Sequence, residues 1–61
     1  MLKKLTYDNW HDAKIEACQA SMDYGFGYVI GESAPFRVAA CELAEEAPAQ
    51  FSTEFKDGVE Q

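Results

Sequence analysis

Basic residues are scarce in this chain, and their scarcity limits what it can bind. Five lysines and arginines stand against eleven aspartates and glutamates, which gives a formal net charge of −6 at pH 7. A surface of this sign repels nucleic acid and attracts basic protein surfaces. We therefore exclude direct binding to DNA or RNA and expect a protein partner. The simpler explanation, that the charge only keeps a small protein soluble, stays open.

Long apolar runs are missing as well. No run approaches the roughly 18 apolar residues of a membrane span. Residues 1–10 begin with basic residues but lack the apolar segment of a secretion signal. We therefore expect a cytosolic protein that does not enter a membrane. In that compartment Cys18 and Cys41 are expected to be reduced, although the sequence leaves open whether they pair.

The sequence also lacks the side-chain combinations that catalysis and metal binding need. A chain of 61 residues has little room for an enclosed cleft, because ligand pockets usually span roughly 300 Å³ or more. His11, the one histidine, lies two helical turns before Cys18, too far for a nucleophile–base pair. No cysteines have the C-x₂-C spacing of a zinc site. We expect no enzyme activity, no metal and no cofactor.

The longest stretch with helical periodicity is Asp8–Tyr24. On a helical wheel, one apolar side is formed by Trp10 and by residues that lie within about 80° of it, namely Ala13, Ala17, Ala20 and Tyr24. Three acids, Asp12, Glu16 and Asp23, fall within about 40° of one another on a different side. The pattern predicts a helix from about Tyr7 to Tyr24. Thr6 is the expected N-cap, and Gly25 is expected just after the helix end.

The glycine-bounded segment that follows, Gly25–Gly31, is the one β-like piece. Its sequence, GFGYVIG, is aromatic and β-branched, so it predicts a short strand or an extended connection. The first five residues, Met1–Leu5, are either a short strand that pairs with it or a tail that packs its leucines.

Two further helices are predicted in the second half of the chain. Ser33 and Pro35 are typical of a helix start, and the expected second helix is Ala34 to about Glu46. Pro48 ends that helix and begins a third, which runs to Asp57.

These segments together predict a mainly α fold. We expect one compact three-helix domain over residues 1–61, with a minor β element around residues 26–30 left open. Its core is expected to contain Trp10, Ala17, Phe26, Ile30, Phe36, Leu43, Phe51 and Phe55.

The segment Gly25–Val29 resembles the first ribonucleoprotein signature of the RNA-recognition motif. That signature begins with a base and closes with an aromatic residue, where this chain has Tyr24 and Gly31. The chain is also too short and too acidic for that fold and its RNA ligand. We interpret the segment as a connection whose aromatic side chains fill the core, or as one exposed aromatic anchor for a partner.

The acidic residues form the candidate binding surface. The predicted first helix carries Asp12, Glu16 and Asp23, the second carries Glu42, Glu45 and Glu46, and Glu32, Glu54 and Asp57 extend the surface if packing brings them round. Like charges four residues apart on a helix, such as Glu42 and Glu46, cost about 0.2–0.5 kcal/mol each. A basic groove on a partner would turn these unfavourable pairs into favourable contacts.

A very short acidic chain with its acids in rows resembles the small inhibitors encoded by phages and mobile elements. Among these are anti-CRISPR proteins that act on type I surveillance complexes and anti-restriction DNA mimics. The resemblance covers the character of the whole chain and rests on no single motif. It implies a monomer or weak dimer that binds a Cas subunit and blocks recognition of target DNA by charge mimicry or steric occlusion.

Two other hypotheses remain beside this one. The first is a small protein–protein interaction module, such as an antitoxin or a phage accessory protein, anchored by the glycine–aromatic segment. The second is a structural domain whose acidity serves only solubility.

Overall fold

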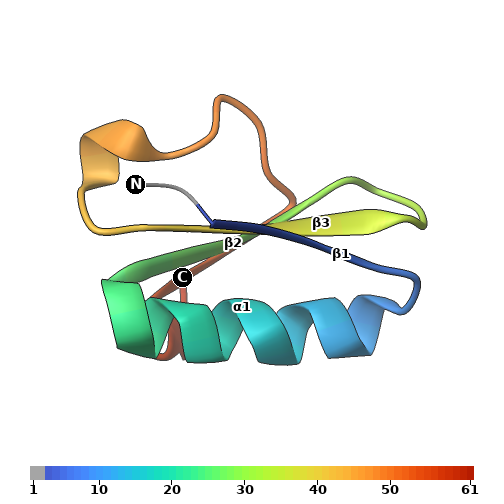
Figure 1. Ribbon diagram of the computed structural model, residues 1–61, viewed down its shortest axis with the longest axis horizontal. Helices are drawn as coiled ribbons and strands as arrows, with labels where there is room; N and C mark the ends of the chain where they lie inside the picture. The colour runs from blue at the N-terminus through green and yellow to red at the C-terminus, as the bar shows by residue number, and fades with distance from the viewer. Residues whose placement is uncertain (1–2) are drawn as a thin grey trace.

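The computed structural model describes residues 3–61, with side chains from Thr6 onward, and shows one helix packed on a five-stranded sheet (Figure 1). The elements in chain order are β1 (Lys3–Tyr7), α1 (Trp10–Tyr24), β2 (Phe26–Ile30), β3 (Phe36–Cys41), the single 3₁₀ turn η1 (Ala44–Glu46), β4 (Thr53–Lys56) and β5 (Val59–Glu60). The strand order is β1-β3-β2-β4-β5, and every neighbouring pair is antiparallel.

The helix α1 crosses one face of this sheet. Because β3 is antiparallel to both β1 and β2, the two outer strands of this trio run parallel, with β3 inserted between them. Parallel strands need a crossover connection, and α1 provides it. The result is a split β–α–β unit, to which β4 and β5 are added at the free edge of β2.

The fold is therefore α+β, and the prediction of a mainly α three-helix domain was wrong. Within the described residues, only the first of the three predicted helices is present. The predicted second helix, residues 34–46, is β3 followed by η1, and the predicted third, residues 48–57, is an extended connection followed by β4. Five of the six residues of β3 are buried, so its apolar pattern lacks the period of two that marks a half-exposed strand.

The predicted β element around residues 26–30 is present as β2, but it is the middle strand of the sheet rather than a minor element. It pairs with β3 on one side and β4 on the other. Gly27 faces α1, and a Cβ added there would overlap the backbone carbonyl of Ala17. The missing side chain therefore allows helix and strand to approach closely. The N-terminal segment forms a strand, which is one of the two alternatives, but the expected pairing with β2 was wrong because β1 pairs with β3. Residues 1 and 2 lie outside the described residues.

The core lies between α1 and the sheet. It contains Ala13, Ala17, Val29, Phe36, Val38 and Phe55. Three of the residues expected in the core are exposed instead: Trp10 (38%), Leu43 (52%) and Phe51 (44%). Phe26 and Ile30 are half-buried. The exposure of Leu43 and Phe51 follows from the two helices that do not form, because both residues lie in the connection between β3 and β4. Trp10 is the first residue of α1.

Only the N-terminal end of α1 differs from the prediction. The helix begins at Trp10, and its N-cap is Asn9 rather than Thr6: the Asn9 Oδ1 accepts a hydrogen bond from the Asp12 N–H at 3.1 Å. Its C-terminal end agrees with the prediction. Gly25 follows Tyr24 with φ of 116° and donates its N–H to the Ser21 carbonyl at 2.8 Å.

Candidate functional site

Three of the predicted site residues lie on α1, and their helical spacing places them along one side of it. Asp12 and Asp23 are exposed, and Glu16 is half-buried beside Tyr7. Partial burial, together with the charge of Glu16 and a hydrogen bond to it, raises the pKa of Tyr7 above its ordinary value of 10.0. We call Asp12, Glu16 and Asp23 the helix acidic row.

The predicted second acidic row does not exist as a helix face. Glu45 and Glu46 lie in η1, which is on the side of the sheet opposite α1 (Figure 1). Glu42 directly follows β3, and its backbone carbonyl lies beside Gly25 at the end of α1. The i,i+4 repulsion argued for Glu42 and Glu46 does not apply, because that helix is absent.

The Glu46 carboxylate lies close enough to Cys41 for its charge to affect the thiol. Burial raises the pKa of the Cys41 thiol, and the negative charge of Glu46 raises it further. The remaining predicted acids are scattered: Glu32 follows β2, Glu54 is half-buried on β4, and Asp57 is in the β4–β5 turn. The structure thus brings the predicted site residues together only within the helix acidic row.

The described basic side chains are mostly engaged away from this row. Lys14 pairs with Glu60, with Nζ and Oε1 3.3 Å apart. Lys56 lies over the ring of Phe26, with Nζ 5.8 Å from its centroid. Arg37 is exposed on β3. Among the side chains that the structure describes, none forms an ion pair with Asp12 or Asp23.

The glycine–aromatic segment is largely buried. Tyr28 is 1% exposed, and burial with the nearby Cys41 and Glu54 raises its pKa to about 12. Phe51 covers it from the β3–β4 connection, with ring centroids 4.9 Å apart. The interpretation that the segment buries its aromatic side chains holds for Tyr28, whereas Phe26 is half-buried. The segment is the central strand of the sheet rather than a connection.

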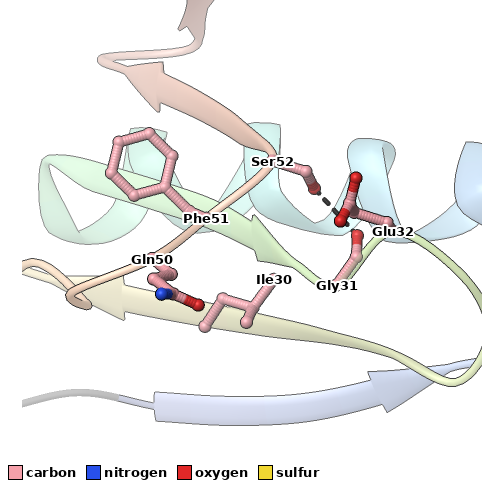
Figure 2. A pocket seen from close by; sticks show the side chains of 6 residues that line it. All are labelled: Ile30, Gly31, Glu32, Gln50, Phe51 and Ser52. Carbon is pink, nitrogen blue, oxygen red and sulfur yellow. Dashed lines mark hydrogen bonds between the residues drawn. The ribbon is translucent and has the colours of Figure 1, made fainter.

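A pocket that the sequence did not indicate lies at the end of β2. It has a volume of about 490 Å³ and is lined by Ile30, Gly31, Glu32, Gln50, Phe51 and Ser52 (Figure 2). The Ser52 hydroxyl donates to the carbonyls of Val29 and Gly31, each at 3.0 Å, and ties the two walls together. No sequence signal pointed to this pocket, because the sequence predicts a helix at Gln50 and Phe51.

No group of three or more histidine, cysteine or acidic side chains in residues 3–61 is arranged to hold a metal ion. Cys18 and Cys41 are both free thiols. The one helix of the described chain is not long and apolar enough to cross a bilayer.

Comparisons with protein-family models, with curated proteins and with solved structures gave no significant match to this chain.

Proposed function

We propose that this chain is a non-catalytic protein that binds a basic surface of another protein through the helix acidic row. The observation that carries the proposal is the exposure of Asp12 and Asp23 on one helix, without an ion pair to any described side chain. Each carboxylate is thus available to a cation on a partner. Charge of one sign on a rigid helix steers a partner of the opposite sign and fixes its orientation.

The density of charge favours occlusion over close imitation of DNA. Asp12 and Asp23 are 11 residues apart, which is about 17 Å along a helix. Duplex DNA carries about ten phosphate charges over that length, whereas the helix acidic row carries three carboxylates. The row supports docking into a basic groove, where the bulk of the domain then blocks access.

The partner class that best fits is the nucleic-acid-binding groove of a host defence complex in the bacterial cytoplasm, such as a type I Cas subunit. The support is the whole-chain resemblance to phage-encoded inhibitors, together with the net charge of −6. A module anchored by the glycine–aromatic segment has less support, because Tyr28 is buried and Phe26 is half-buried under Lys56.

The test is binding to a purified type I Cas surveillance complex with two matched double variants. D12K/D23K reverses two of the three charges of the helix acidic row, and E42K/E45K makes the same charge change outside that row, in and before η1. Glu16 is spared because it interacts with Tyr7. We expect D12K/D23K to raise Kd at least about tenfold and E42K/E45K to raise it less than about threefold.

Binding should also weaken steeply as NaCl rises, and target DNA should compete with the chain. Equal effects of the two variants would place the interface elsewhere. Simultaneous binding of DNA and the chain would contradict occlusion, and no binding to any type I complex would remove the Cas assignment.

A further inference from the structure

We infer that the pocket at the end of β2 receives an arginine or lysine side chain from the protein partner. The inference extends the proposed function, from which it takes the expectation of a basic partner. It rests on a feature separate from the helix acidic row, because the pocket is formed by β2 and by the connection that crosses the opposite side of the sheet (Figures 1 and 2).

The walls of the pocket match a side chain with an apolar stem and a polar head. Ile30 is half-buried and Phe51 is 44% exposed, so both offer apolar surface that remains partly accessible. Figure 2 shows the Gln50 amide beside Ile30, and Glu32 with Ser52 on the other side of the pocket. Lysine and arginine cover apolar surface with their methylene stems and keep the charged head in polar surroundings.

The polar groups of the pocket favour a cationic head. Its lining carries one ionisable side chain, Glu32, which is exposed and has no described partner. The Ser52 hydroxyl already donates to the carbonyls of Val29 and Gly31. The hydroxyl therefore presents its lone pairs to an incoming group, as do the Glu32 carboxylate and the Gln50 amide oxygen. Acceptors of this kind suit a donor-rich ammonium or guanidinium group.

The size and charge of the pocket point to the same occupant. A volume of about 490 Å³ accommodates a long side chain with some water and lies within the usual range for ligand pockets. Arg37 is opposite Ile30 in the strand register but does not line the pocket. The net charge of −6 further disfavours an anionic occupant.

The test is a titration of the whole chain with N-acetyl-arginine amide. Binding is measured by two-dimensional amide NMR. The neutral citrulline analogue has nearly the same shape and serves as the ligand control. We expect arginine to shift the amide signals of Ile30, Gly31 and Ser52 with millimolar affinity, and citrulline to bind about three- to fivefold more weakly. E32Q should weaken arginine binding by about the same factor, whereas E45Q, which lies outside the pocket, should leave it unchanged.

Equal binding of arginine and citrulline, equal effects of E32Q and E45Q, or shifts confined to α1 would overturn the inference. The D12K/D23K variant separates it from the proposed function. That variant should weaken the protein complex yet leave the arginine-induced shifts at the pocket in place. If the arginine probe fails while D12K/D23K still weakens the complex, the inference falls and the proposed function stands.

Discussion

Gly27 is a residue at which helix and sheet approach each other closely. Its position on β2 faces the backbone carbonyl of Ala17, and any Cβ there would overlap that carbonyl. Backbone cannot move aside as the end of a flexible side chain can. We therefore expect Gly27→Ala to destabilise the fold by about 3 kcal/mol or more. For a domain of this size that loss approaches the whole free energy of unfolding, so urea denaturation followed by circular dichroism should find the variant largely unfolded.

Gly31→Ala is the matched control for that change. Gly31 has φ of 114°, but the nearest atoms to an added Cβ are 3.6 Å away. Only backbone strain is introduced there, and it costs about 1–2 kcal/mol. If both variants lost the same stability, the close approach of α1 to Gly27 would not be what constrains that position.

The pKa of Tyr28 predicts how the stability of the fold changes at alkaline pH. Its pKa is raised from 10.0 to about 12 in the folded chain, so the protonated phenol is favoured by folding. The resulting stability is fully present below the unfolded pKa of about 10 and is lost as pH rises through about 12. We expect the urea midpoint to fall between pH 10 and pH 12. The Tyr28→Phe variant should fall less over that range, and an unchanged slope would show that another group is responsible.

At the scale of elements, a buried hydroxyl on α1 connects the helix to the turn of the β4–β5 hairpin. The Ser21 Oγ donates to the Cys18 carbonyl at 2.7 Å and accepts from the Gly58 N–H at 2.8 Å. The Cys18 thiol donates to the Gly58 carbonyl at 3.3 Å. Ser21→Ala leaves the Gly58 N–H without its acceptor, which should cost about 1–3 kcal/mol. Urea denaturation measures the loss, and hydrogen exchange at Gly58 should accelerate.

Ser52→Ala is the control for this hairpin prediction. Ser52 also donates through its hydroxyl to backbone carbonyls, but it is exposed, and water can replace its bonds. We expect a loss below about 1 kcal/mol. A larger loss in Ser52→Ala than in Ser21→Ala would mean that the hairpin is held mainly by β4 pairing rather than by the helix.

The hairpin itself could have been predicted from its turn residues. Asp57 and Gly58 both have positive φ, at 52° and 85°, and connect Lys56 to Val59. Asp-Gly is a preferred pair for the two central residues of a tight hairpin turn, because both adopt positive φ there. A third helix that runs to Asp57 conflicts with this turn chemistry, although the i,i+4 spacing of Phe51 and Phe55 favours a helix.

The one helix was predictable because its small apolar residues repeat at helical spacing. Ala13, Ala17 and Ala20 are all buried against the sheet. The run Phe36–Cys41 was not predictable in the same way. Its alanines have high helix propensity. In the folded chain, however, the strand pairs with β1 along one edge and with β2 along the other, and five of its six residues are buried. Tertiary pairing thus overrides local preference.

For the candidate site, the sequence indicates the residue types but not their arrangement. The placement of Asp12, Glu16 and Asp23 along one helix follows directly from the period of α1. The second row depended on a helix that does not form, and Glu45 and Glu46 lie in η1 instead. The pocket joins residues about twenty positions apart, from Ile30 to Gln50, and only the folded chain brings them together.

At the scale of the whole molecule, net charge predicts how salt affects folding. A charge of −6 on 61 residues repels itself more when the chain is compact than when it is unfolded. Screening at higher ionic strength reduces that repulsion. Raising NaCl from about 20 mM to about 300 mM should therefore raise the free energy of unfolding, on the order of 1 kcal/mol. Urea is the denaturant to use because it carries no charge. The single described ion pair, Lys14 with Glu60, is partly exposed and opposes the trend only weakly.

The control for this prediction is a variant with half the net charge. D12N/E42Q/E45Q removes three acids and changes the charge from −6 to −3, so its stability should depend less on NaCl. A flat or falling stability in the parent chain would show that self-repulsion is not significant. Salt should strengthen the fold while it weakens the proposed complex with a basic partner. If binding is lost at high salt while the urea midpoint rises, the loss therefore comes from the interface and not from unfolding of the chain.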